Sequence, residues 1–317
     1  MMQEPKMAVV GIGATGTVLA AALLARYPET LLIGHDPDLG NNLRSNGLHV
    51  AGALTYRVPV KQYTTEMKGL ASFHPNFIFL ATKTFHLPLI LNELKAVVAP
   101  GTYIVSTQNG LGPEDLVAEH FGHQATLRMS LNYGAARNEP GRTEVAFFNK
   151  PNHLGCLVPE GREAGLKVAQ ILTACGLDTE CVDDIRLFVW KKMIMKCTMA
   201  SICAVTDKTI REALSYPPTR EIAEACFNEA LSVAKAMGYD IGRDYLKQAA
   251  GYLEKVGHHK DSMCHDIANK THTEIDYLGG KIVEYGRKTN VATPVFRTMT
   301  NLVKALEDSY LSKKAGI

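Results

Sequence analysis

The stretch K-M-A-V-V-G-I-G-A-T-G, residues 6–16, decides the fold class of this chain. Its apolar run from Met7 to Val10 has the length and composition of a buried strand, and a helical pattern follows from Thr17 to Arg26. Glycines stand between them at GxGxxG spacing: Gly11, Gly13 and Gly16. The order of strand, tight turn and helix predicts the first unit of an α/β dinucleotide-binding domain.

Each of the three glycines has a separate role in such a turn. Gly11 allows a sharp turn, Gly13 lets the backbone approach a pyrophosphate, and Gly16 lets the helix pack close to the strand. The first N–H groups of the helix and its positive dipole end then face the phosphates. Gly-rich loops also form plain turns, but the flanking strand and helix favour the cofactor.

Length and composition indicate an ordinary globular protein. The 317 residues are enough for two domains, and a net charge of +2 gives no bias toward nucleic acid or membrane. The seven cysteines form no CxxC pair, which argues against a zinc site and a disulfide framework. Neither a leader segment nor a membrane span is expected, which predicts a cytoplasmic protein. The cysteine pattern predicts that no metal is bound.

A second buried strand, residues 30–34, leads to Asp36. Asp36 lies about twenty residues after Gly16, where an acidic side chain accepts hydrogen bonds from the ribose hydroxyls and repels a 2′-phosphate. This position predicts a slight preference for NAD(H) over NADP(H). Alternatively, Asp36 or Asp38 only caps the next helix, and Arg44 binds the phosphate of NADP.

Two further strands end in polar side chains. Residues 76–82 precede Lys83, and residues 103–107 precede Asn109. Ligands gather at the carboxyl ends of strands in a doubly wound sheet, which favours cofactor contacts for both. A solvated strand end and an Asn-Gly turn are the alternatives. The region between them is predicted helical from Leu87 to Val98, and residues 48–62 are predicted to form a hairpin.

The period of the apolar pattern changes near Asp183. Residues 1–183 are predicted to form a Rossmann domain, with later strands at 126–133, 144–148, 154–158 and 178–182 and a helix at 163–175. Residues 184–317 are predicted to form an all-helical domain. Its expected helices span 184–205, 219–237, 245–256, 262–287 and 295–311.

The helical domain carries two groups of candidate site residues. Lys192 and Lys196 lie one turn apart and share a helix face flanked by apolar side chains, which makes Lys192 a candidate acid. A solvated basic face is the alternative. Further on, Ser262 and Glu274 belong to the runs S-M-C-H-D and H-T-E-I-D-Y.

Together these motifs resemble the ketopantoate reductase (2-dehydropantoate 2-reductase) family over nearly the whole chain. The shared motifs are G-I-G-A-T-G at residues 11–16, T-K ending at 83, Q-N-G around 109, W-K-K-M around 192, and the two runs around 262 and 274. The resemblance implies a Rossmann domain followed by a helical domain, and a dimer through the latter. It also implies a catalytic lysine at Lys192, a partner carboxylate at Glu274, a substrate hydrogen bond at Ser262, and contacts at Asn109 and Lys83 between substrate and nicotinamide.

Three positions depart from the family pattern. Lys196 and Ala200 stand where the family usually has asparagines, and His259 stands where it often has another. In the family these positions contact the hydroxyls and the carboxylate of the substrate, so Lys196 and His259 are candidate substrate contacts. Asp36 also stands where NADP-using relatives place an arginine.

The resemblance therefore implies NAD(P)H-dependent reduction of a small 2-oxo acid, with ketopantoate as the first candidate. One rival is a relative that reduces another 2-oxo acid or an opine-type imine. Another is a non-catalytic dinucleotide sensor, which has no need for a proton donor such as Lys192 or for Glu274.

Overall fold

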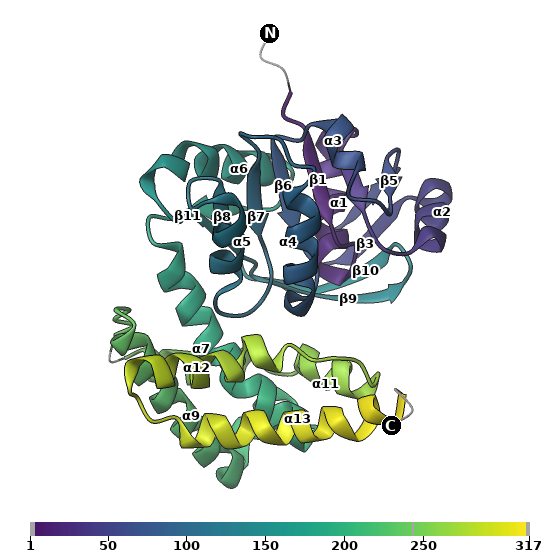
Figure 1. Ribbon diagram of the computed structural model, residues 1–317. Coiled ribbons are helices and arrows are strands. Elements are labelled where there is room, and N and C mark those ends of the chain that lie inside the picture. Colours follow the sequence, from purple (N-terminus) through teal and green to yellow (C-terminus); the bar gives the residue numbers. More distant parts are fainter. Residues whose placement is uncertain (1–3, 243, 315–317) are drawn as a thin grey trace. The chain divides into compact units, whose positions relative to one another are not determined.

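The computed structural model describes residues 4–242 and 244–314, and these form two compact units. Of the described residues, the first unit contains 4–108 and 113–185, and the second contains 109–112, 186–242 and 244–314. The second unit therefore takes four residues out of the segment that the sequence assigns to the first domain. Figure 1 shows a sheet flanked by helices in the first unit and helices alone in the second.

An eight-stranded sheet forms the centre of the first unit, in the order β12-β11-β8-β7-β6-β1-β2-β5. The strands from β8 to β5 are parallel, whereas β11 runs antiparallel to β8. The strands are β1 (Met7–Val10), β2 (Leu31–Ile33), β5 (Tyr63–Thr64), β6 (Phe77–Leu80), β7 (Tyr103–Ser106), β8 (Thr126–Ser130), β11 (Asn152–Cys156) and β12 (Thr179–Cys181). The predicted α/β fold with an N-terminal Rossmann-like domain is confirmed.

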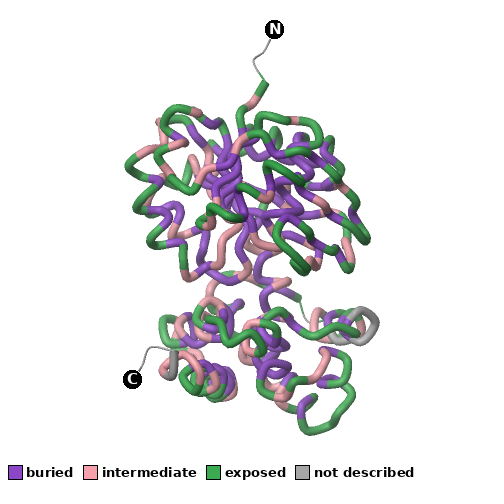
Figure 2. Tube along the Cα trace, turned by 90° about the vertical axis from the view of Figure 1, so that its right-hand side faces the viewer, coloured by how far each residue is buried: buried purple, intermediate pink, exposed green. Residues whose placement is uncertain are grey.

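Alternate residues of β1 face two separate cores. Met7 and Val9 pack with α1 (Ala14–Arg26) and α6 (Arg162–Ala174), while Ala8 and Val10 pack with α4 (Leu87–Lys95) and α5 (Pro113–Phe121). Helices α4 and α5 lie side by side on their face of the sheet (Figure 1). Because both faces are covered, β1 and β6 are continuously apolar and buried. Figure 2 colours the trace by burial and shows buried residues gathered in the interior of the first unit.

A second sheet, β4-β3-β10-β9, packs against α1. Its strands are β3 (Leu48–Gly52), β4 (Tyr56–Val58), β9 (Tyr133–Glu139) and β10 (Arg142–Phe148). β3 and β4 are antiparallel, which confirms the predicted hairpin. The single strand predicted over 126–133 is wrong, because β8 ends at Ser130 and β9 begins at Tyr133 in the other sheet.

Short helices connect these strands or cap their ends. They are α2 (Pro37–Asn46), α3 (Gly69–Phe73), the 3-10 turn η1 (Thr84–His86) and the 3-10 turn η2 (Pro159–Gly161).

The second unit is built around α7 (Ile185–Thr206). From Cys197 to Ala204 every residue of α7 is buried, so this half of the helix is enclosed on all sides. Earlier in α7, the Trp190 ring lies 5.7 Å from that of Tyr239 and 5.9 Å from that of Tyr285. The other helices are α8 (Ile210–Ser215), α9 (Pro217–Ala236), α10 (Tyr245–Val256), α11 (Ser262–Ala268), η3 (Ile275–Tyr277), α12 (Gly279–Thr289) and α13 (Pro294–Lys314).

The prediction of one helix over residues 262–287 is wrong. α11 ends at Ala268, and Lys270 takes a left-handed conformation with φ 53°. The backbone N–H of Thr273 then bonds the Glu307 carboxylate instead of a helical carbonyl, at 2.5 Å. The next α-helix begins at Gly279, where an added Cβ would lie 2.9 Å from Thr300 Oγ1 of α13. Contacts with α13 therefore break the helix that the local pattern predicts.

Within the described ranges, no helix combines the length and apolar character that a membrane span needs.

Candidate active site

The glycine loop after β1 has the shape that a dinucleotide needs. Gly11 has φ 96°, and a Cβ there would lie 2.6 Å from the Thr82 side chain. A Cβ on Gly16 would lie 1.8 Å from the Gly11 carbonyl oxygen. In contrast, a Cβ on Gly13 would meet nothing within 4 Å. Gly11 and Gly16 are therefore required by packing, while Gly13 leaves open space at the start of α1.

The N-terminus of α1 suits a phosphate. Gly13 is its N-cap residue and supplies no side-chain hydrogen bond to the first N–H groups. These groups and the helix dipole attract an anion, and the space beside Gly13 admits one. The residues present thus fit the pyrophosphate of a nicotinamide dinucleotide.

Asp36 follows β2 and caps α2. Its Oδ1 accepts a hydrogen bond of 2.9 Å from the Asp38 N–H, as the capping alternative requires. Oδ2 has no hydrogen-bond partner among residues 4–242 and 244–314. Arg44 donates to the Tyr63 carbonyl at 3.1 Å and to Asn41 Oδ1 at 3.4 Å. Asp36 can therefore cap the helix with one oxygen and accept from a ribose hydroxyl with the other.

Lys83 lies at the same sheet edge as the glycine loop. β1 and β6 pair in parallel with Val10 opposite Leu80, so Gly11 and Ala81 leave the sheet together. Lys83 follows two residues later and precedes η1. The register of β6, β1 and β2 therefore places Gly11, Asp36 and Lys83 after the carboxyl ends of three neighbouring strands.

The loop at residues 109–112 packs against two elements of the second unit. The Gly110 N–H donates to the Met193 sulfur on α7 at 3.1 Å, and the Leu111 N–H donates to the Tyr277 carbonyl of η3 at 3.0 Å. Gly110 has φ 120°, and a Cβ there would lie 2.9 Å from the Tyr277 carbonyl oxygen. Only glycine allows this close approach.

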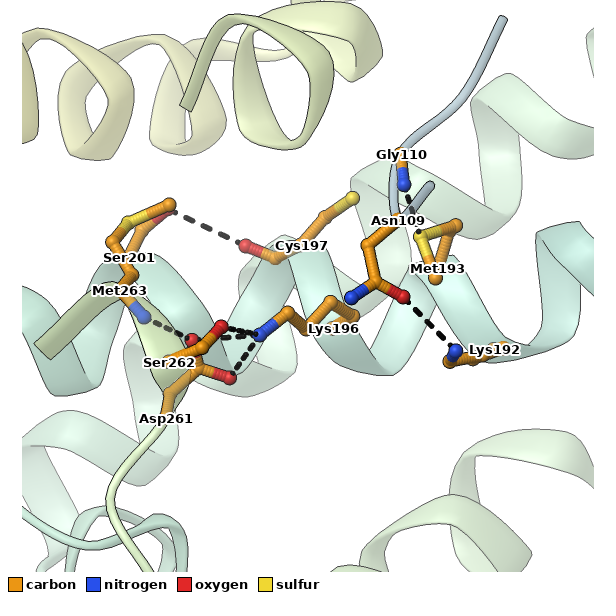
Figure 3. A network of polar contacts seen from close by, with 10 residues as sticks. All are labelled: Asn109, Gly110, Lys192, Met193, Lys196, Cys197, Ser201, Asp261, Ser262 and Met263. Atoms are coloured by element: carbon orange, nitrogen blue, oxygen red, sulfur yellow. Dashed lines mark hydrogen bonds and ion pairs between the residues drawn. The ribbon is translucent and has the colours of Figure 1, made fainter. Parts of the chain in front are cut away.

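Lys192 and Asn109 are in direct contact. Lys192 Nζ donates to Asn109 Oδ1 at 3.0 Å (Figure 3). An ammonium can only donate, so this bond directs the amide oxygen toward Lys192 and its NH₂ group away. The half-buried Lys192 is thereby held at a defined position on α7.

One turn further along α7, Lys196 forms a separate network. Its Nζ lies 2.8 Å from Asp261 Oδ1, 2.7 Å from Asp261 Oδ2 and 2.8 Å from Ser262 Oγ (Figure 3). The Lys196 and Asp261 side chains are only 16% and 6% exposed. The structure thus brings Lys196 and Ser262 together, as candidate residues of one site, and adds Asp261.

The remaining candidates lie on nearby segments. Glu274 is half-buried immediately before η3, the element that holds Leu111 of the Asn109 loop. His259 is exposed two residues before Asp261, and its carbonyl accepts from Ile210 at 3.4 Å. Ala200 is fully buried in α7, so this departure from the family pattern alters the core.

Sequence reasoning missed Asp261. The signal was local, because an aspartate directly before a helix that begins with Ser262 is a typical N-cap, and its Oδ1 does accept from the Met263 N–H at 2.9 Å. Its pairing with Lys196, 65 residues away, depends on tertiary structure. Over the described part of the chain, no cluster of three His, Cys, Asp or Glu residues is placed to hold a metal ion.

Comparison with known proteins shows the family of this chain. The family model for ketopantoate reductase PanE/ApbA matches residues 7–158, and the model for its C-terminal part matches residues 184–307. The chain belongs to the ketopantoate reductase family. As a member it is an NAD(P)-dependent 2-oxo acid reductase.

Relatives of this family match the chain over nearly its full length. The 2-dehydropantoate 2-reductase of Streptococcus pyogenes serotype M3 is 28% identical over 303 residues, 94% of this chain and 97% of that protein. The enzyme of the same name from Pyrococcus abyssi is 29% identical over 306 residues, 95% of this chain and 98% of that protein.

Solved structures of two kinds share the fold. D-mandelate dehydrogenase with NADH and anilino(oxo)acetate superposes with a TM-score of 0.87 at 25% identity, over 96% of this chain and 99% of that one. The 2-dehydropantoate 2-reductase from Geobacter metallireducens has the same TM-score at 22% identity, over 95% and 99% of the chains. The family fold therefore carries more than one 2-oxo acid or 2-hydroxy acid substrate.

Proposed function

We propose that this protein reduces the keto group of a small 2-oxo acid, with 2-dehydropantoate as the first candidate substrate. The observation that carries this proposal is the Lys192 ammonium, held by Asn109 at 3.0 Å on a largely buried helix. The curated relatives with full-length matches are 2-dehydropantoate 2-reductases, which supports the choice of substrate.

The chemistry requires a positioned cation. A reduced nicotinamide supplies a hydride to the keto carbon when it is bound. Negative charge then develops on the keto oxygen, and an ammonium about 3 Å away stabilises it and donates a proton to complete the hydroxyl. Lys192 is the group proposed for both tasks, and it regains its proton from solvent.

The other candidates orient the reactants. Asn109 directs Lys192, and Glu274 is proposed to hold the substrate hydroxyl or the ammonium. Gly11, Gly13 and Gly16 are proposed to bind the pyrophosphate, Lys83 to contact the cofactor, and Ser262 and His259 to contact the acid. For the cofactor itself we propose a preference for NADH, supported by the unpartnered Oδ2 of Asp36. The dimer through the helical unit stays a prediction, which light scattering in solution would measure.

A second substrate class has its own support. The D-mandelate dehydrogenase fold matches at a TM-score of 0.87, and Lys196 and His259 depart from the family pattern. Mixing protein and NADH with 2-dehydropantoate, or with the 2-oxo acid that corresponds to mandelate, and following nicotinamide absorbance separates the two. If NADH is oxidised neither with these two acids nor with a wider panel of 2-oxo acids, the proposed function is contradicted.

A further inference from the structure

Lys196 is already charge-paired by the fold. Its ammonium has three N–H groups, and three acceptors lie within hydrogen-bond distance: the two oxygens of Asp261 and Ser262 Oγ. Each N–H therefore has an acceptor within the cluster. The carboxylate of Asp261 cancels the charge of Lys196 where both side chains are largely shielded from water. Lys196 thus differs from a bare cation that would attract a second carboxylate of a substrate.

Asp261 is itself fixed by the backbone. Its Oδ1 accepts from the Met263 N–H at 2.9 Å in addition to the Lys196 ammonium. This N-cap bond sets the start of α11 and keeps the carboxylate facing α7. The pair therefore joins two elements that the chain separates by more than sixty residues.

The pair determines how Ser262 can bond. A hydroxyl has one hydrogen to donate and two lone pairs to accept, and a lone pair of Ser262 accepts from Lys196 at 2.8 Å. The ammonium cannot accept the hydroxyl hydrogen, so that hydrogen points to another group. Ser262 is exposed, so this group can belong to a ligand. An adjacent cation also makes the O–H a stronger donor.

We propose that Lys196 and Asp261 form a specificity-determining pair for a monocarboxylic 2-oxo acid. Because the Ser262 oxygen accepts from Lys196, the Ser262 hydroxyl donates its hydrogen to a carboxylate or carbonyl oxygen of that acid. Asp261 neutralises Lys196, which selects against substrates with a second carboxylate. Lys196 acts through Ser262 and is a positioning residue. The inference rests on the proposed function and assigns its substrate class.

The decisive variant is Asp261→Asn. Asparagine is an equally good N-cap and has nearly the same shape, so α11 keeps its start while Lys196 loses its counter-charge. We expect the ratio of kcat/KM for 2-oxoglutarate to that for 2-dehydropantoate to rise about tenfold or more, mainly through a lower KM for the dicarboxylic acid. Asp261→Ser, which also retains a capping side chain, serves if the asparagine variant does not fold.

The matched control is the double variant Lys196→Gln/Asp261→Asn. It keeps two polar side chains that can bond each other but removes both charges. It should show no gain for the dicarboxylic acid, whereas Lys196→Arg should keep the parent's substrate ratio because arginine can pair with Asp261. An active parent whose substrate ratio is unchanged in Asp261→Asn would overturn the proposal and leave the proposed function intact.

A binding measurement distinguishes the proposed function from the charge-pairing role of Asp261. Calorimetric titration with 2-oxoglutarate requires no turnover and should show tighter binding to Asp261→Asn than to the parent or to the double variant. If no 2-oxo acid is reduced but this difference appears, the proposed function fails and the charge-pairing role of Asp261 stands. Equal binding to all three proteins would overturn the inference regardless of activity.

Discussion

At the scale of single residues, α7 presents two ammonium groups in different circumstances. Lys192 bonds the amide of Asn109, and Lys196 bonds the carboxylate of Asp261 and the hydroxyl of Ser262. Two free cations one turn apart would repel each other and favour the neutral form of one. Asp261 removes that repulsion, because it places a negative charge within 2.7 Å of Lys196. The two ammonium groups of α7 are therefore held by different partners, and the position of Lys192 is set by Asn109.

Replacement of Lys192 tests the proton donor directly. If Lys192 stabilises the developing charge, Lys192→Ala should lower kcat by a factor on the order of a hundred or more, while NADH binding stays near that of the parent. Steady-state kinetics and fluorescence titration with NADH measure the two quantities. Lys191→Ala is the matched control, since it removes the same charge from the neighbouring position of α7. Unchanged turnover in Lys192→Ala would remove this residue from the mechanism.

Asp36 allows its two roles to be separated. Asp36→Asn keeps a side chain that caps α2 but loses the negative charge, so the stability of the helix should change little. The parent should prefer NADH in kcat/KM, and the variant should narrow that preference because it no longer repels a 2′-phosphate. Steady-state kinetics of the parent and of Asp36→Asn with NADH and with NADPH give the kcat/KM values that test this expectation. A parent that prefers NADPH would show that Asp36 acts only as a cap.

At the scale of elements, a buried ion pair joins α5 to β8. Arg128 Nε lies 3.1 Å from Glu114 Oε2, and the side chains are 1% and 5% exposed. The same guanidinium lies 3.3 Å from the carbonyl and the hydroxyl of Ser106 at the end of β7. Burial lowers the pKa of Arg128, and the Glu114 carboxylate opposes that shift. The pair thus fixes the strand end from which the Asn109 loop departs.

Removal of one charge from this pair should destabilise the first unit strongly. Glu114→Gln keeps the shape but removes the carboxylate that lies 3.1 Å from the buried Arg128 guanidinium. Loss of one partner of a buried ion pair costs about 3–5 kcal/mol in comparable sites. The urea midpoint of unfolding should fall accordingly. The double variant Arg128→Met/Glu114→Leu is the control, because apolar replacements of a buried pair are often nearly neutral. A Glu114→Gln midpoint equal to that of the parent would contradict the structural role.

At the scale of the whole molecule, the seven cysteines are all free thiols, and most lie in the cores. Burial raises the pKa of Cys175 and of Cys264 to about 11, of Cys226 to about 12, and of Cys197 and Cys203 further. Only the thiolate reacts quickly with alkylating reagents, and a raised pKa keeps these side chains protonated near neutral pH. The cores of both units therefore protect their thiols.

Alkylation measures this protection. Iodoacetamide near pH 8 should label the native protein mainly at Cys156 and, more slowly, at Cys181, the two cysteines that are not buried. The reaction of Cys181 is slower because partial burial raises its pKa as well. In denaturing urea all seven should react, because the burial that raises the pKa values is lost. Peptide mass spectrometry identifies the labelled positions. Rapid labelling of Cys197 or Cys203 in the native protein would contradict the enclosed second half of α7.

The local sequence determines much of this protein. The apolar run before Gly11 and the spacing of Gly13 and Gly16 predict the first strand, turn and helix, because a buried strand and a close helix approach permit few other residues. The change from strand to helix period near Asp183 predicts the all-helical second part in the same way.

Tertiary structure alone decides the rest. The helix predicted over residues 262–287 breaks because Glu307 of α13 takes the Thr273 N–H, an interaction 34 residues away in sequence. The sequence predicts two neighbouring cations on one helix face, Lys192 and Lys196. The fold brings the Asp261 carboxylate beside Lys196. Local propensity depends on neighbours within a turn or two, whereas the partner of a buried charge is set by which elements pack together. That packing places Asp261 against α7 and leaves Lys192 beside Asn109.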